Sequence, residues 1–169
     1  MDAKKVSEPI QMKNPTTVER KSDRELVVTR TFNGPARLVF EAWTKPELFK
    51  RWWIPKSVGM SLLSCELDVR VGGGYRLVFA IDATKTMAFH GKYLEVIPSS
   101  RISWTNDEAD DGPVTTVTFE EKGGKTLLAV HELFPTKAAL DAAVASGELE
   151  KTEVFEQLDE LLVTLSARD

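Results

Sequence analysis

Apolar and polar residues alternate with a period of two through most of the middle of the chain, as expected for β-strands with one buried face. The pattern predicts strands at 26–32, 61–69, 75–81, 88–97, 101–106, 113–121 and 125–133. The residues predicted to face inward from the second and third of these strands are Leu63, Cys65, Leu67, Val69, Tyr75, Leu77, Phe79 and Ile81. Three consecutive glycines at 72–74 predict a turn or bulge between these two strands, where the backbone needs a positive φ or a close neighbour.

Between the first and second strands, the period lengthens to that of a helix. Pro35 suits a first helical turn because it has no N–H group to leave unpaired, and 36–43 supplies an apolar face with helical spacing. Thr44 and Glu47 have the spacing of a capping box, which predicts a second short helix from about 45 to 53. Pro55 ends this helix, because the residue before a proline avoids helical angles.

The last part of the chain is predicted to be helical from Thr136, a suitable N-cap, to about residue 165. Its apolar stripe loses bulk in the middle, where Gly147 and Lys151 fall on it. Two explanations stay open. Ser146 and Gly147 end one helix before another begins, or a continuous helix has a gap that leaves room for a molecule beneath it.

The order of these elements indicates an α+β protein with a helix-grip fold. A curved antiparallel sheet of about seven strands would wrap around the long C-terminal helix, with two short helices after the first strand. Residues 1–22 are polar and without period, which predicts a flexible leader, and 23–169 are predicted to form a single domain. Because a large curved sheet and one helix rarely fill the space between them, a cavity there is the expected ligand site.

Composition and charge narrow the classes of partner. The net charge is −4 and no basic stretch accompanies the aromatic residues, so nucleic acids and anionic membrane surfaces are not expected as partners. Cys65 is the only cysteine, which excludes an intramolecular disulfide and fits a reducing compartment. Because no apolar run has the length of a signal peptide or a membrane span, we expect a cytoplasmic protein without membrane insertion.

Four segments of the chain, in order, resemble one known family. They read RTFNGPARLVFEAWTKPELFKRWW, ELDVRVGGGYRL, HGKYLEVIPSSRISWTN and ASGELEKTEVFEQLDELLVTL, and they span roughly residues 25 to 165. The chain is similar here to the family named after the activator of the heat-shock-protein-90 ATPase. The resemblance implies the START-like helix-grip fold, which birch-pollen-allergen-like and polyketide-cyclase-like proteins share. It also implies a chaperone as an alternative partner.

Candidate chemistry is sparse. His90 and His131 are the only histidines and Cys65 has no local partner motif, so neither a zinc site nor a catalytic residue is predicted, and no cofactor is implied. His131 shares its strand face with Leu127 and Ala129 and is predicted to point inward. There it would be a satisfied core histidine, a polar contact for a ligand, or a general acid–base group of a cyclase-like reaction. Asp68 and Arg70 are expected to pair locally.

The sequence therefore favours non-catalytic binding of a hydrophobic small molecule, lipid-like, aromatic or polyketide-like. A chaperone-stimulating interaction is the alternative, a cyclase-like or hydrolase-like enzyme is a third hypothesis, and a homodimer is left open. Adjacent helical residues point about 100° apart, so Trp52 and Trp53 cannot share a face, and either all three tryptophans of 43–53 plug the core or at least one meets the ligand. The candidate cavity residues are Trp52, Trp53, Cys65, Leu77, Phe79, Tyr93, Trp104, Val117, Phe119, His131, Lys151 and Phe155.

Overall fold

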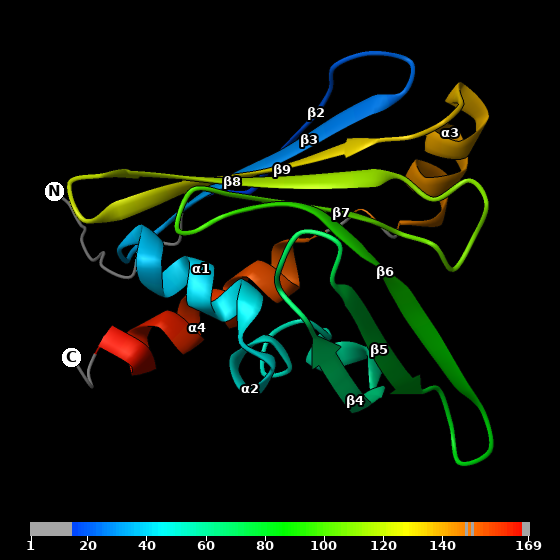
Figure 1. Cartoon of the computed structure of the whole chain (residues 1–169), viewed down its shortest axis with the longest axis horizontal. Coiled ribbons are helices and arrows are strands. Elements are labelled where there is room, and N and C mark those ends of the chain that lie inside the picture. The colour runs from blue at the N-terminus through cyan, green and yellow to red at the C-terminus, as the bar shows by residue number, and fades with distance from the viewer. Residues whose placement is uncertain (1–14, 148, 150, 167–169) are drawn as a thin grey trace, which may run out of the picture.

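The computed structural model describes residues 15–147, 149 and 151–166 of the chain. In these residues, one eight-stranded antiparallel sheet has the strand order β2-β3-β9-β8-β7-β6-β5-β4 (Figure 1). The strands are β2 (Thr17–Arg20), β3 (Glu25–Phe32), β4 (Ser61–Leu67), β5 (Gly74–Ala80), β6 (Thr86–Ile97), β7 (Arg101–Thr105), β8 (Val114–Lys122) and β9 (Lys125–Leu133). The helices are α1 (Ala36–Thr44), α2 (Pro46–Phe49), the 3₁₀ turn η1 (Lys56–Val58), α3 (Lys137–Ser146) and α4 (Thr152–Ser166).

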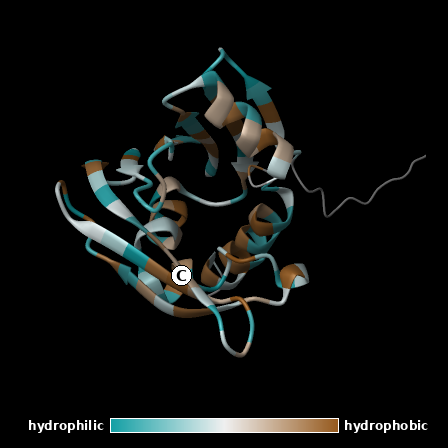
Figure 2. Ribbon diagram, turned by 90° about the vertical axis from the view of Figure 1, so that its right-hand side faces the viewer, coloured by the Kyte–Doolittle hydropathy of each residue, from teal (hydrophilic) through white to brown (hydrophobic). Residues whose placement is uncertain are grey.

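The predicted α+β helix-grip architecture is confirmed. The sheet curves, and α1 and α4 lie together on its concave side (Figure 1). Hydrophobic and hydrophilic residues alternate along the strands (Figure 2), so each strand gives one face to the core, as the period of two predicts. The strand from 125 to 133 is found with the predicted bounds, and the others within a few residues of them.

The strand β2 departs from the predicted sequence pattern. Thr17–Arg20 lies within the segment predicted to be a flexible leader, but it pairs with β3 in register from Thr17 opposite Thr29 to Arg20 opposite Leu26. All four residues of β2 are exposed, so no apolar alternation marks it. Backbone pairing and an ion pair of 2.7 Å from Arg20 to Asp141 hold it instead. The rest of the predicted leader up to residue 14 lies outside the described residues.

A bulge in β4 changes which of its residues face the core. The register with β5 shifts between Leu62 and Ser64, so Leu63 becomes an extra residue and points outward with 60% of its surface exposed. Leu62 packs on the core in its place, and Cys65 and Leu67 pack there as predicted. The three-glycine turn behaves as predicted: Gly72 has φ +84°, and a Cβ on Gly73 would lie 2.1 Å from the Asp68 carbonyl oxygen. Asp68 and Arg70 form the expected local pair, with 3.0 Å between Arg70 Nε and the carboxylate.

The first two helices form at the expected places, but the predicted capping box does not form and the second helix is shorter than predicted. Pro35 is the N-cap of α1, and Leu38, Val39 and Ala42 lie on its buried face. Thr44 does not cap α2. It is the last residue of α1, and its hydroxyl donates to the Phe40 carbonyl at 2.8 Å, a bond within α1 that competes with capping. Lys45 is the N-cap of α2, which ends at Phe49 rather than at Trp53.

The interruption in the last apolar stripe is a helix break. Thr136 caps α3 as predicted, because its Oγ1 accepts a hydrogen bond from the Ala139 N–H at 3.1 Å. Gly147 ends α3 with φ +79°, a left-handed conformation that glycine adopts without strain. The second explanation, a continuous helix with a gap beneath it, is therefore wrong.

The helix α4 packs tightly on the concave face of the sheet. Phe155 and Leu158 are almost fully buried, and the Phe155 ring meets Phe32 of β3 edge to face at 5.4 Å. Burying an apolar side chain of this size stabilises the fold by about 1.5–3 kcal/mol. The interface also contains a buried charge, Arg30 of β3, whose Nη2 lies 2.6 Å from Asp159 of α4.

Candidate functional site

An aromatic cluster surrounds a cavity between the first helices and strands β4 to β7. All four tryptophans of the chain belong to it. Trp52 is fully buried, and its indole N–H donates to the Ala42 carbonyl at 2.9 Å, which fixes the turn after α2 onto α1. Trp53 is half-buried and lines the cavity. The two adjacent rings meet edge to face at 5.4 Å between centroids, one in the core and one in the cavity wall. Because α2 ends at Phe49, the helical spacing used to predict their divergence does not apply to them.

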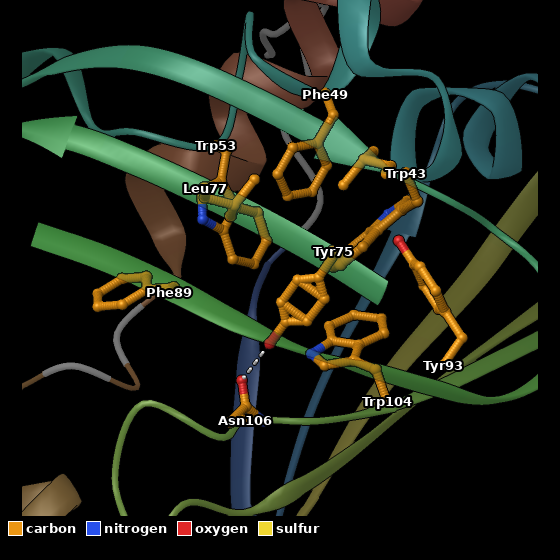
Figure 3. A pocket seen from close by; sticks show the side chains of 10 residues that line it. Trp43, Phe49, Trp53, Tyr75, Leu77, Phe89, Tyr93, Trp104 and Asn106 are labelled. Atoms are coloured by element: carbon orange, nitrogen blue, oxygen red, sulfur yellow. Dashed lines mark hydrogen bonds between the residues drawn. The ribbon is translucent and has the colours of Figure 1, made fainter. Parts of the chain in front are cut away.

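The cavity holds about 50 Å³ and is lined mainly by rings (Figure 3). Its lining residues are Trp43, Phe49, Trp53, Leu67, Tyr75, Leu77, Phe89, Tyr93, Trp104 and Asn106. They come from α1, α2, the loop after α2, strands β4 to β7 and the loop after β7. Trp53, Phe89 and Asn106 are partly exposed, so the wall of the cavity is thin on their side.

The cavity is not at the place that the sequence predicted. The sequence places the cavity between the sheet and the C-terminal helix, but no residue of α4 lines it. Under α4, the side chains of Phe155, Leu158 and Phe32 are each exposed by 1% or less, so bulky groups fill that interface. The cavity lies instead where α1 and α2 end, because the aromatic rings there pack edge to face and do not fill all the space between them.

Two polar groups of the cavity wall are already paired. The Tyr75 hydroxyl donates to the Thr105 carbonyl at 2.8 Å and lies 3.2 Å from Asn106 Oδ1. The Asn106 amide nitrogen donates to the Pro113 carbonyl at 2.7 Å and to Thr115 Oγ1 at 2.9 Å. These bonds hold one end of the cavity rigidly. Burial raises the pKa of Tyr75 well above its usual range, so its hydroxyl stays protonated at neutral pH.

Two other polar groups of the cavity wall have no hydrogen-bond partner in the described part of the chain. Trp43 is exposed by only 3%, and its Nε1 is buried with no hydrogen-bond partner among the described residues. Figure 3 shows the Tyr93 hydroxyl pointing toward Trp43, and both residues pack on the ring of Trp104, at 6.0 Å and 6.4 Å between centroids. Burial raises the pKa of Tyr93 far above neutrality, so its hydroxyl also stays a donor.

The outer wall of the cavity is held by contacts to α4. Trp53 stacks on Phe49 with 4.6 Å between centroids and an interplanar angle of 28°, and Lys151 Nζ lies 5.4 Å from the centre of its ring. The Gln157 side chain donates to the carbonyls of Trp52 and Ile54 and accepts from the Lys56 N–H. The loop that carries Trp53 is therefore attached to α4 by three hydrogen bonds of one amide group.

The structure brings together part of the predicted set of cavity residues. Trp53, Leu77, Tyr93 and Trp104 line the cavity, and Lys151 touches Trp53. The predicted residues that lie in the solid core are Trp52, Phe79, Val117, Phe119 and Phe155. Cys65 packs half-buried against the core without lining the cavity.

His131 does not point inward as predicted. Leu128 and Val130 are buried, so the inward face of β9 consists of the even-numbered residues, and His131 lies on the opposite face. There its Nε2 is 2.9 Å from the Glu25 carboxylate, and about a third of each side chain is exposed. The prediction failed because Leu127, used to define the inner face, is itself 40% exposed. His90 is exposed as well.

Six lining residues were not predicted as site residues: Trp43, Phe49, Leu67, Tyr75, Phe89 and Asn106. For Tyr75 a signal existed, because it alternates on the same strand face as Leu77. Asn106 follows a strand in a loop, where no periodicity indicates direction. Among the described residues, no three His, Cys, Asp or Glu side chains gather so that they could hold a metal ion. No described helix is both long and apolar enough to span a membrane.

A curved antiparallel sheet gripping a C-terminal helix defines the class of START-like helix-grip proteins. Residues 33–163 match the model of the family described as Activator of Hsp90 ATPase homolog 1-like protein. The chain belongs to this family. A search of the curated proteins found no match.

Solved structures agree with this fold. A crystal structure of a protein from Rhodobacter sphaeroides is 24% identical, with a TM-score of 0.80, and the match covers 92% of this chain and 100% of that one. A solution structure from Staphylococcus epidermidis is 28% identical, with a TM-score of 0.74 and coverage of 88% and 94%. The AHSA1-like protein of Aeromonas hydrophila is 20% identical, with a TM-score of 0.61 and coverage of 83% and 94%.

Proposed function

We propose that this protein binds a hydrophobic small molecule in the aromatic cavity and does so without catalysis. The observation that carries the proposal is the lining itself, in which seven of ten residues are aromatic and none is charged. Small-molecule sites typically combine such an apolar wall with a few fixed polar groups. The lining contains no histidine, carboxylate, lysine or cysteine, and burial raises the pKa of its two tyrosines, so it offers no group suited to act as a general base in a cyclase-like or hydrolase-like reaction.

The size of the cavity sets a condition on binding. An engineered protein cavity of about 150 Å³ binds benzene, and this one is about 50 Å³. A ligand of benzene size or larger therefore has to displace part of the wall. Trp53 is the wall residue best suited to move, because it is half-buried and lies on a loop rather than on the sheet.

The test is a thermal-shift and tryptophan-fluorescence titration with small apolar probes, such as 1-methylnaphthalene. At a probe concentration of 100 times Kd, binding stabilises the folded state by about 2.7 kcal/mol. For a domain of this size, that raises Tm by about 5–10 °C. The emission of the clustered tryptophans is expected to change over the same concentration range, because a probe in the cavity touches their rings.

A matched pair of variants assigns the effect to the cavity. Phe89→Trp adds bulk to the lining, and Leu94→Trp places the same indole at an exposed position of the same strand. We expect Phe89→Trp to abolish the thermal shift and Leu94→Trp to keep it. The proposal fails if no apolar probe raises Tm, or if Phe89→Trp responds as the unmodified protein does.

The name of the family supplies the second candidate function, an interaction with a chaperone ATPase. This interaction is tested by measuring the ATPase rate of an Hsp90-type chaperone with and without this protein. A rate increase that persists in the Phe89→Trp variant would assign the function to the protein surface. A rate increase that is seen only when an apolar probe occupies the cavity would mean that ligand binding controls the interaction with the chaperone.

A further inference from the structure

The polar atoms around the cavity divide into a paired and an unpaired set. Asn106 and the Tyr75 hydroxyl are bonded to each other and to atoms of Thr105, Pro113 and Thr115. The Trp43 N–H has no partner among the described residues, although only 3% of the surface of Trp43 is exposed. The structure records no hydrogen bond of the Tyr93 hydroxyl to any described residue, and this group points toward Trp43 (Figure 3).

Both unpaired groups are hydrogen-bond donors. An indole N–H can only donate, and the Tyr93 hydroxyl, which is protonated at neutral pH, can donate as well as accept. A buried donor left without a partner costs about 1–3 kcal/mol. Among the atoms of the cavity wall, this cost applies to the buried Trp43 N–H, and a correctly placed acceptor atom removes it.

We propose that the ligand of this cavity is a neutral molecule with an oxygen acceptor, such as a ketone or ester carbonyl, that accepts hydrogen bonds from Trp43 Nε1 and the Tyr93 hydroxyl. Its hydrocarbon part lies against the rings of Phe49, Trp53 and Trp104. The inference rests on the proposed function and narrows it from hydrophobic molecules in general to those that carry one acceptor.

The lining disfavours two charged classes of ligand. A carboxylate would be buried among residues that include no lysine or arginine, and an unpaired charge in such surroundings is costly. A quaternary ammonium group is attracted to ring faces, but it accepts no hydrogen bond and would leave the Trp43 N–H unpaired. Of these classes, a neutral molecule with an acceptor atom is the one that can pack against the rings and also accept hydrogen bonds from the two donors.

The test compares two probes of nearly the same shape, cyclohexanone and methylenecyclohexane, which differ by C=O in place of C=CH₂. Binding is followed by ¹H–¹⁵N NMR, in which each of the four indole N–H groups gives its own signal. We expect cyclohexanone to bind about tenfold more tightly, equivalent to about 1.4 kcal/mol. We also expect it to move the Trp43 indole proton downfield, whereas methylenecyclohexane leaves that proton without an acceptor.

Variants separate the donors from the packing. Tyr93→Phe removes one hydroxyl and is expected to reduce the preference for the ketone several-fold. Trp43→Phe removes the indole N–H and is expected to abolish most of it. Trp52→Phe is the matched control, because its N–H is already bonded to Ala42 and the residue does not line the cavity. It should keep the preference.

The outcomes distinguish this inference from the function on which it rests. Equal affinity for both probes would overturn the inference that the ligand carries an acceptor, and it would leave the proposed binding of hydrophobic molecules intact. Tighter binding of tetramethylammonium than of cyclohexanone would overturn it in favour of a cationic ligand. If neither cyclic probe nor any other apolar probe binds, both the inference and the proposed function fail.

Discussion

Arg30 and Asp159 form an ion pair of 2.6 Å that joins strand β3 to helix α4. The Arg30 side chain is 1% exposed and that of Asp159 is 22% exposed, so the positive charge is buried and the negative charge is near the surface. Arg30 also donates to Thr16 Oγ1 at 2.8 Å and lies 5.7 Å from the centre of the Phe32 ring. The contact between α4 and the sheet thus contains a buried positive charge, Arg30, whose counter-charge is Asp159.

Asp159→Ala is expected to lower the free energy of unfolding by about 3 kcal/mol, because it leaves a buried guanidinium without its counter-charge. Urea denaturation measures the change. Glu160→Ala, at an exposed position next to it, is expected to stay within about 0.5 kcal/mol of the unmodified protein. The double variant Arg30→Met with Asp159→Leu should recover most of the loss, since it removes both charges. Equal stability of Asp159→Ala and Glu160→Ala would contradict this account.

Gln157→Leu is expected to loosen the loop that carries Trp53. The amide group of Gln157 makes three hydrogen bonds to the backbone of this loop, at Trp52, Ile54 and Lys56. Losing them should cost about 1–3 kcal/mol and speed hydrogen exchange at the Lys56 amide. Val163→Ala, on the exposed side of the same helix, serves as the control. Unchanged protection of the Lys56 amide in Gln157→Leu would show that the loop is held by other contacts.

Gly91→Ala is expected to destabilise the protein by about 2–3 kcal/mol, as overpacking does. A Cβ at Gly91 would lie 2.0 Å from the carbonyl oxygen of Thr105, the same atom that accepts the Tyr75 hydroxyl. The neighbouring strand offers a matched control in Gly74→Ala, whose Cβ would be 3.5 Å from the nearest atom. That variant should change the unfolding free energy by less than about 1 kcal/mol. Similar Tm values for the two alanine variants would refute the clash.

The Cys65 thiol is expected to react slowly in the folded protein. Burial raises its pKa from 9.0 to about 11, which lowers the thiolate fraction at pH 8 about 100-fold. Alkylation by iodoacetamide at pH 8 should therefore be about 100-fold slower in the native protein than in guanidinium chloride. Equal rates would place the thiol in an ordinary aqueous environment.

The same pKa shift sets a direction for stability against pH. The folded state holds the Cys65 proton more tightly than the unfolded chain, so this contribution to stability is complete below pH 9. It is lost as the pH rises from 9 towards about 11, where the folded state must also ionise. Cys65→Ala should remove this part of the alkaline loss of stability, which denaturation curves at pH 8 and pH 10.5 measure.

Periodicity was sufficient to predict most of the fold, because each strand or helix must bury one face. It failed where the chain departs from a regular period. The bulge after Leu62 turned Leu63 outward, and the exposed Leu127 led to the wrong face for His131. The strand β2 has no buried face, so hydrophobic patterning could not find it.

The candidate site was only partly predictable for a different reason. A strand pattern says which residues face inward, but not where packing leaves space. Tyr93 and Phe119 both face inward, yet only Tyr93 lines the cavity, whereas Phe119 meets Phe40 at 5.3 Å between ring centroids. The unpaired N–H of Trp43 likewise depends on atoms from several elements and has no local signature.

The two outermost strands of the described sheet bear on how copies of this protein can associate. An exposed strand edge is a template for pairing with another chain, and charged residues or bulges are common ways to prevent it. On one side, β2 is short and carries Glu19 and Arg20. On the other, the bulge at Leu63 breaks the hydrogen-bonding ladder of β4. Edge-to-edge pairing of two copies through these two described strands is therefore disfavoured.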